Sequence, residues 1–435
     1  MSGLPTAETE VESQDDPGFQ RISLGEIDPA RSRHMWTRSA VDIDGDQVVV
    51  GQWDGTITAF ETDSLEARWT SSHPDHVVGV AHFEGIETLG DGNETGKQVA
   101  VAGRGESGTI AAYDADSGDR HWSYETAADI GEPTSDRMFE LPYVVCLEPA
   151  APDSELAVYA AARRYERDGD RRRWHSTIYA FAPDGTVRWR YETDASPIAL
   201  DLDDRGERLA VGYNRCPGAA DTGLVVLEAD IGSPLWTWDP GTEGERRVGD
   251  VAFDGDTLAV SSHGDKRGYL LGPRGAERWI VDLAVETEIG GELLYAYPNH
   301  TYANDGKFAF VTGNTYATDR RETESRHPNE HRIAVFDNGT LTWEASVGGF
   351  VHGLAADSET VVTPCAQNFR VRDPETHAVR RFDLESGPTE TVPFEGVVTA
   401  AAIDGGRVAV IEEPVAYHDD CVVRGEHALS VGSLE

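Results

Sequence analysis

Apolar and polar residues alternate with a period of two through most of the chain, in short segments that end at polar turns. The clearest copy covers residues 108–122, where an alternating segment leads to the turn Asp-Ala-Asp-Ser-Gly and then to Trp122. Residues 55–69 and 176–189 repeat the pattern. Period-two alternation is typical of a half-buried strand, and Asp, Ser and Gly favour a tight turn. Each copy therefore predicts a β-hairpin whose Trp packs between neighbouring hairpin units.

Two further short strands are predicted before each hairpin. Residues 248–253 and 257–262 form one such pair, and residues 398–403 and 407–411 form another. Asp-Gly or Gly-Gly separates the members of each pair, as tight hairpin turns prefer. Each unit then holds four strands in about 40 to 65 residues, which is the size of a propeller blade. The pattern predicts an all-β fold, a single β-propeller of four-stranded antiparallel blades.

The aromatic residues that open the outermost strands give the expected number of blades. They are Trp69, Trp122, Trp189, Trp236, Trp279, Trp343 and Phe382. After Phe382 the chain supplies one more blade, from residues 397–435, that lacks an outer strand, and an N-terminal strand near residues 33–38 would complete it. We expect eight blades within residues 21–435, after a flexible acidic tail over residues 1–20. Seven blades with one extra strand is the alternative.

One repeat carries a motif that resembles a known family. Ala112, Asp114, Ser117, Gly118 and Trp122 fit the pattern Ala-x-Asp-x-x-Ser-Gly-x-x-x-Trp. This pattern resembles the quinoprotein-type (PQQ-like) propeller repeat, and it is also similar to the repeat of outer-membrane assembly lipoproteins. The resemblance extends over about 400 residues and implies a propeller fold.

For the quinoprotein dehydrogenases, the same resemblance implies a bound quinone, a calcium ion, an Asp base and a vicinal disulfide. The four cysteines, Cys146, Cys216, Cys365 and Cys421, are not adjacent to one another. No zinc-binding or phosphate-binding signature stands elsewhere in the sequence. We therefore expect a propeller that is not an enzyme, with no cofactor and no metal.

The charge of the chain is strongly negative. There are 78 Asp and Glu against 37 Lys and Arg, a net charge of −41, and only Lys97, Lys266 and Lys307 are lysines. Many acids with few lysines resemble proteins of halophilic archaea, in which carboxylates hold water and counterions. The sign argues against a general nucleic-acid binder. Without an apolar span of about 18 residues or an apolar leader, we expect a cytoplasmic protein that does not enter a membrane.

Arginines are concentrated in two segments, 163–175 and 316–332, that we expect to be loops on one face. Arg is suited to carboxylate and phosphate contacts, so the segments predict a docking site for an anionic partner, with a protein favoured over nucleic acid. Pairing of these arginines with nearby Asp and Glu is the alternative. The candidate docking residues are Arg163, Arg164, Arg167, Arg171, Arg172, Arg173, Trp174, Arg320, Arg321 and Arg326.

The mouth of the central channel is a second candidate site, because ligands often bind in such openings. Its candidate residues are His76, Arg137, Arg247, His352 and Glu395. Two functions are therefore expected from the sequence. The first is a monomeric scaffold for protein–protein interaction; the rival is a small-molecule or metal-binding enzyme or sensor at the channel mouth.

Overall fold

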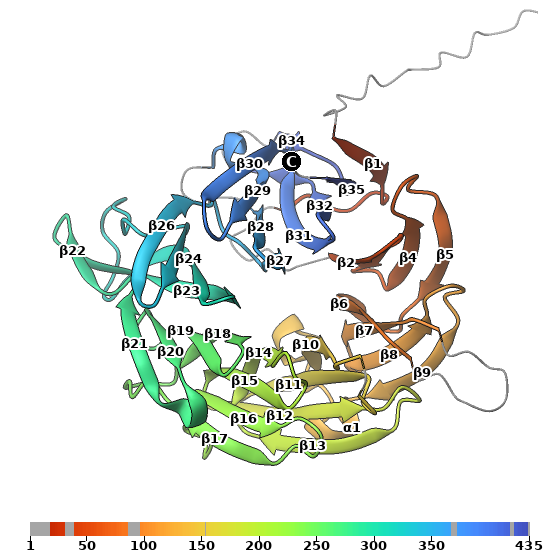
Figure 1. Ribbon diagram of the computed structural model, residues 1–435, viewed down its shortest axis with the longest axis horizontal. Helices are drawn as coiled ribbons and strands as arrows, with labels where there is room; N and C mark the ends of the chain where they lie inside the picture. Colours follow the sequence, from red (N-terminus) through yellow and green to blue (C-terminus); the bar gives the residue numbers. More distant parts are fainter. Residues whose placement is uncertain are drawn as a thin grey trace, which may run out of the picture.

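Antiparallel sheets follow one another around a ring in the computed structural model (Figure 1). The structure describes residues 18–30, 39–85, 96–152, 154–366, 372–417 and 422–433. Helices within these ranges are short: α1 (Ala127–Ile130) and the 3-10 turns η1 (Met138–Glu140), η2 (Pro273–Gly275) and η3 (Pro374–Thr376). The prediction of an all-β propeller with four-stranded antiparallel sheets is confirmed.

Consecutive strands pair within each sheet. One sheet holds β2 (Ser39–Asp44), β3 (Gln47–Gln52), β4 (Thr56–Glu61) and β5 (Ala67–Ser72). The next strands are β6 (His76–Phe83), β7 (Gln98–Arg104), β8 (Thr109–Asp114) and β9 (Arg120–Glu125), followed by β10 (Tyr143–Pro149), β11 (Val158–Asp168), β12 (Arg171–Phe181) and β13 (Val187–Thr193). The pair Tyr143 and Arg104 joins these two groups of four into one eight-stranded sheet.

The remaining sheets follow the same order. One contains β14 (Ser196–Leu202), β15 (Arg208–Arg215), β16 (Leu224–Glu228) and β17 (Pro234–Trp238), and the next contains β18 (Val248–Asp254), β19 (Thr257–Ser262), β20 (Arg267–Leu271) and β21 (Glu277–Asp282). A five-stranded sheet contains β22 (Thr287–Ile289), β23 (Glu292–Asn304), β24 (Lys307–Ala317), β25 (Arg332–Asp337) and β26 (Thr340–Ser346). The last contains β27 (Ala355–Asp357), β28 (Thr360–Cys365), β29 (Ala378–Asp383) and β30 (Gly387–Pro393). A small pair is formed by β33 (Val415–Ala416) and β34 (Val423–Arg424).

Each outer-strand Trp packs against a turn glycine of the following unit. Trp189 donates its Nε1 proton to the carbonyl of Ala229 at 2.8 Å, and a Cβ added at Gly232 would stand 2.5 Å from the Trp189 ring. The same relationship joins Trp69 to Gly118, Trp122 to Gly185, Trp236 to Gly275, Trp279 to Gly339 and Trp343 to Gly387. The prediction that these rings pack between neighbouring units is confirmed.

The two ends of the chain meet in one sheet. The strand β1 (Phe19–Ser23) pairs with β35 (Ala428–Ser433), which lies beside β32 (Arg407–Glu413) and β31 (Val397–Asp404). The outer position that we expected residues 33–38 to fill is held by β1, and residues 31–38 lie outside the described part. Phe19 packs edge-on against Phe394, with ring centroids 6.4 Å apart, which fixes β1 against the neighbouring sheet. Phe19 and Gln20 thus belong to a strand and not to the expected tail.

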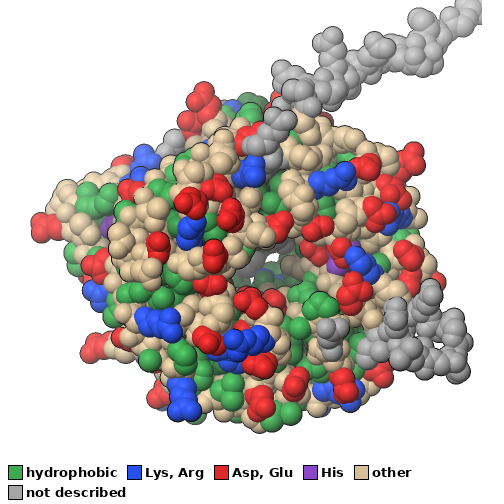
Figure 2. Space-filling model, in the orientation of Figure 1, with side chains coloured by type: hydrophobic (Ala, Val, Ile, Leu, Met, Phe, Trp, Pro, Cys, Tyr) green, Lys and Arg blue, Asp and Glu red, His purple; other side chains and the backbone are tan. Residues whose placement is uncertain are grey.

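The innermost strands are linked to one another by carboxylates. Asp42 of β2 accepts the backbone N–H of His82 on β6 at 2.7 Å, and Asp250 of β18 accepts that of Thr301 on β23 at 2.9 Å. Figure 1 places these strands around the centre of the ring, and Figure 2 shows an opening there, with Asp and Glu side chains spread over the visible face. These links join the inner strands of neighbouring sheets to each other.

Candidate functional site

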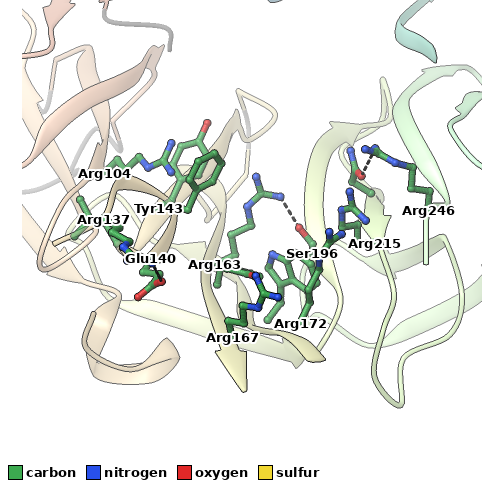
Figure 3. Close-up of a pocket in the computed structure, with 15 residues that line it drawn as sticks. Arg104, Arg137, Glu140, Tyr143, Arg163, Arg167, Arg172, Ser196, Arg215 and Arg246 are labelled. Atoms are coloured by element: carbon green, nitrogen blue, oxygen red, sulfur yellow. Dashed lines mark hydrogen bonds and ion pairs between the residues drawn. The ribbon is translucent and has the colours of Figure 1, made fainter. Parts of the chain in front are cut away.

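A cavity of about 530 Å³ opens where several strands begin and end (Figure 3). Arg104 ends β7, Tyr143 begins β10, Ser196 begins β14 and Arg215 ends β15. In an antiparallel sheet one strand begins where its neighbour ends, so these residues share one face of the ring. Seven arginines line the cavity, which we call the arginine pocket: Arg104, Arg137, Arg163, Arg167, Arg172, Arg215 and Arg246. Glu140 is the only acidic residue among its described lining residues.

Arg104 and Arg163, the inner pair, hold their guanidinium groups over the ring of Tyr143. The two carbons Cζ lie 4.6 and 5.4 Å from the ring centroid. Arg163 donates through Nη1 to Ser196 Oγ at 2.5 Å and to the carbonyl of Pro197 at 2.9 Å, and Arg104 donates through Nε to the carbonyl of Met138 at 3.0 Å. Neutral acceptors and an aromatic face thus set the positions of both cations.

Burial makes it costly in free energy to keep Arg104 and Arg163 charged. It lowers the pKa of Arg104 to about 10, and it also lowers the pKa of Arg163. In both cases the desolvation of a cation is the largest cause. A bound anion would offset this cost at Arg163, because it would supply the opposite charge that Arg163 does not find among the described carboxylates.

Arg172 and Arg215, the outer pair, share one oxygen of Glu245. Glu245 Oε2 lies 3.7 Å from Arg172 Nη1 and 3.4 Å from Arg215 Nη1. Arg246 stands beside them, donates to Asn214 Oδ1 at 3.4 Å and lies 4.5 Å from the ring centroid of Tyr297. Burial lowers the pKa of Arg215, and the positive charges of Arg246 and Arg172 lower it further. One carboxylate therefore does not neutralise this group of three cations.

The alternative of pairing with local acids holds for part of the arginines only. Arg164 pairs with Glu166 at 3.0 Å, and Arg173 pairs with Asp168 at 2.7 Å. In contrast, Arg163 and Arg246 form no ion pair with any carboxylate in the described ranges. Such cations are notable in a chain with 78 acidic residues.

The first arginine segment contributes four of its candidates to the pocket: Arg163, Arg167, Arg172 and Trp174. Arg164 is instead buried and donates to the carbonyl of Ile130 at 2.9 Å, while Arg171 and Arg173 are exposed outside the pocket. The expectation of a loop over residues 163–175 is wrong. The ladder between β11 and β12 continues to the pair Asp168 and Arg171, and the cross-strand partners Tyr165 and Trp174 pack together within it, with ring centroids 5.3 Å apart.

The second arginine segment lies apart from the arginine pocket. Arg321 donates to the carbonyls of Thr323 and Thr315, at 2.9 and 3.3 Å, and Arg320 is exposed. Arg326 lines a different cavity, of about 460 Å³, and stands 3.9 Å from Glu330. The structure therefore does not join the two segments into one lining.

The residues expected at the channel mouth do not converge on one cavity. Arg137 lines the arginine pocket, where its exposed side chain stands 4.0 Å from Glu140. The other four have separate surroundings: His76 stacks on Trp53, Arg247 pairs with Asp239 at 2.7 Å, His352 packs against Phe350, and Glu395 is exposed. Burial lowers the pKa of His352 to about 4, so this imidazole is neutral near pH 7.

Five of the fifteen lining residues were among the candidates, and Arg104 and Tyr143 are two of the ten that were not. Arg104 and Tyr143 stand in separate parts of the sequence, and each is a single polar residue at the end of a buried strand. The available signal in the sequence was the position of Arg104 at the end of an apolar strand. That end of the strand lies on the same face of the ring as Arg163. A search for arginines at strand ends would have found it.

The described residues offer neither a cluster of metal ligands nor a membrane-spanning helix. Among the described residues, no group of three or more His, Cys, Asp or Glu is placed to hold a metal ion. Cys146, Cys216 and Cys365 are free thiols. Within the same ranges, no helix has the length and apolar character needed to cross a membrane.

Comparison with known proteins gives the type of propeller. Residues 31–166 match the family described as outer membrane protein assembly factor BamB. BamB from Moraxella catarrhalis superposes with a TM-score of 0.53 at 14% identity, over 95% of this chain and 98% of that one. The fold is a PQQ-like β-propeller.

Two further solved structures are similar to this chain in fold. The Dos1 propeller covers 96% of this PQQ-like propeller and 94% of its own chain, with 10% identity and a TM-score of 0.57. The computationally designed Ika8 protein covers 93% and 99%, with 13% identity and a TM-score of 0.56. No curated protein matches the sequence. At these identities the likeness concerns the fold alone, so the function must be argued from the arginine pocket.

Proposed function

We propose that this propeller is a non-enzymatic scaffold that docks an acidic segment of a protein partner in the arginine pocket. One observation carries the proposal: seven arginines line a single pocket on a chain of net charge −41. Arg163 and Arg246, which form no ion pair with described carboxylates, supply charge for a partner. Clustered arginines are a common means of recognising acidic motifs.

The aromatic side chains favour an acidic protein segment over a nucleic-acid strand. Binding of single strands uses free aromatic faces on which bases stack. Here Trp174 is buried and packs on Tyr165 at 5.3 Å, and cations lie over Tyr143 and Tyr297. Phe139 is 59% exposed at the edge of the pocket, where it offers an apolar contact to a side chain of the partner.

The setting that we propose is the cytoplasm of a halophilic archaeon. At molar salt the Debye length is about 3 Å, so long-range attraction is screened and binding depends on direct contacts. Half-buried arginines held in place by neutral acceptors suit that condition. We propose eight blades, because the eight-stranded sheet consists of two consecutive groups of four strands and each group counts as one blade. The proposal also takes the propeller to be a monomer.

A peptide-binding experiment tests the docking function. A fluorescein-labelled polyglutamate peptide is titrated with the wild type and with the double variant Arg163→Ala, Arg246→Ala. We expect the double variant to bind at least about tenfold more weakly, since hydrogen bonds to charged groups contribute about 1.5–3 kcal/mol each. Arg205→Ala is the matched control, because Arg205 is an exposed arginine on the turn between β14 and β15 and lies 3.9 Å from Asp256. Equal binding by the wild type and the double variant would contradict the proposal.

A small-molecule role is the second candidate, and the volume of the pocket favours it. The cavity of about 530 Å³ lies in the usual range for small ligands, about 300–1,000 Å³. Citrate and pyrophosphate, titrated in the same assay, test it. Saturable binding of either anion without binding of the peptide would support the small-molecule role.

A further inference from the structure

The arginine pocket contains two groups of cations that differ in what holds them. Arg163, in the inner pair, is positioned by neutral groups: the ring of Tyr143, the hydroxyl of Ser196 and the carbonyl of Pro197. The outer pair is instead in contact with an acid of this chain, Glu245. A ligand acid can therefore bind at Arg163 without displacing a carboxylate, whereas at Arg172 and Arg215 it must displace Glu245.

The inner pair is prepared for an anion before the ligand arrives. Arg163 donates from Nη1 to Ser196 Oγ and to the carbonyl of Pro197, and its guanidinium also lies over the ring of Tyr143. Arg163 lines the cavity, and its guanidinium carries further N–H donors besides those of Nη1 (Figure 3). A guanidinium fixed in this way loses little side-chain freedom when it binds a carboxylate.

The contact of Glu245 with the outer pair is a weak one. A single oxygen serves both guanidinium groups, at 3.4 and 3.7 Å, which is longer than the usual distance of about 2.8 Å for such pairs. The side chain of Glu245 is 40% exposed, so solvent reduces the attraction. Arg246 adds a third positive charge beside this single carboxylate, and after burial its charge is the next largest cause that lowers the pKa of Arg215.

We infer that Glu245 holds the place of a second acidic group of the ligand, and that the pocket recognises an extended peptide with two acidic side chains. One side chain binds the inner pair at Arg163. The other replaces Glu245 at Arg172 and Arg215. This inference rests on the proposed docking function and adds the number of acids and an internal competitor.

The charge balance supports an exchange of one carboxylate for another. A ligand acid that replaces Glu245 gains Arg172 and Arg215 and leaves Glu245 free to turn into solvent. The peptide must then compete with a tethered acid, so the affinity in the wild type is lower than the same arginines could give. Removal of the competitor should tighten binding, although the variant loses an ion pair.

The test uses short glycine–serine peptides that carry either one or two glutamates and a fluorescein label. Binding is measured by anisotropy for the wild type, Glu245→Gln and the control Glu243→Gln. Glu243 is exposed, lies two residues away, and forms no ion pair within the described residues, so its variant makes the same change in net charge. Glu245→Ala serves as a second variant, and thermal unfolding checks that every variant is folded.

For the two-glutamate peptide we expect Glu245→Gln to lower the Kd by about two- to fivefold, the range that an exposed ion pair is worth. For the one-glutamate peptide, and for Glu243→Gln with either peptide, we expect changes below about twofold. If the wild type binds the peptides and Arg163→Ala weakens binding, but Glu245→Gln behaves as Glu243→Gln does, the competitor inference is overturned and the docking function stands. If the wild type binds neither peptide, both are overturned.

Discussion

Arg21, near the start of the described chain, donates a hydrogen bond to Glu412 across 391 positions of sequence. Arg21 lies on β1, and Glu412 lies on β32 with a side chain that is fully buried. Burial raises the pKa of Glu412, while Arg21 and the backbone N–H of Gly396 favour its charged form. The ion pair therefore joins the N-terminal strand to the sheet that contains the C-terminal strand.

Arg21→Ala should destabilise the propeller by about 1–3 kcal/mol. Loss of one partner of a buried pair usually costs about 3–5 kcal/mol, and we reduce this because Arg21 is 39% exposed. Urea unfolding followed by tryptophan fluorescence measures the change. Arg407→Ala is the matched control, since Arg407 lies on β32, as Glu412 does, but forms its ion pair with the exposed Asp63. A loss in Arg21→Ala no larger than in the control would contradict a structural role for the buried pair.

Deletion of residues 1–23 should have a larger effect than the point substitution. It removes all of β1, so β35 becomes an uncovered sheet edge and Glu412 loses its cation. We expect aggregation, visible as early elution in size-exclusion chromatography at equal protein concentration. Deletion of residues 1–17 keeps β1 and is the control. A monomeric, fully folded chain without β1 would show that this strand is dispensable.

Gly232→Ala should destabilise the protein more than Gly255→Ala. Both glycines have positive φ, +68° and +54°, so an alanine at either position is strained by about 1–2 kcal/mol. A Cβ at Gly232 would also stand 2.5 Å from the Trp189 ring, whereas a Cβ at Gly255 meets nothing within 4 Å. Overpacking adds about 1–3 kcal/mol. Comparison of the two melting curves tests whether the Trp–Gly contact joins neighbouring sheets; equal losses would show that it does not.

The sequence predicted the repeating unit well because the unit is made by local chemistry. Alternation, turn glycines and a Trp at a fixed place act within about 15 residues, and they survive in most copies. The closing strand depends instead on a partner at the other end of the chain. Residues 33–38 carry the more prominent aromatic, Trp36, whereas the strand that pairs with β35 is marked only by Phe19 and Ile22.

The candidate site was predicted in part for a similar reason. Arg163 and Arg172 were found because arginines are dense around them in sequence. Arg104 and Tyr143 reach the same pocket from other strands, because Tyr143 pairs with Arg163 on one side and with Arg104 on the other, and these pairings are not visible in the sequence. The density of arginines also misled, since Arg320, Arg321 and Arg326 lie outside this pocket, and Arg321 donates to carbonyls of its own segment.

Asp250→Asn should change how stability depends on pH. Burial raises the pKa of Asp250 to about 7, above the ordinary value of 3.8. A raised carboxyl pKa stabilises the fold fully below about 3.8, and this contribution is lost as the pH rises through about 7. The variant lacks the titration, although it loses an acceptor for the N–H of Val251 or Thr301 at every pH.

The deficit of the Asp250→Asn variant should therefore shrink between about pH 4 and about pH 7, by at most about 1.4 kcal/mol per pH unit. Urea unfolding at several pH values measures this difference. Burial raises the pKa of Asp201 to about 8 and the charge of Asp250 contributes to this shift, so the comparison is repeated in an Asp201→Asn background, which removes the second titration. A deficit that stays constant with pH would show that Asp250 does not titrate in this range.

Arg172→Ala should weaken binding of the two-glutamate peptide, whereas Arg173→Ala should not. The two residues are neighbours on β12, but alternate residues of a strand point to opposite faces. Arg172 lines the arginine pocket and shares Glu245 with Arg215, whereas Arg173 pairs with Asp168 at 2.7 Å outside it. We expect Arg172→Ala to raise the Kd by about threefold or more and Arg173→Ala to change it by less than about twofold. Both variants remove one positive charge, so a general effect of net charge would weaken binding equally, and equal weakening would show that the peptide binds outside the pocket.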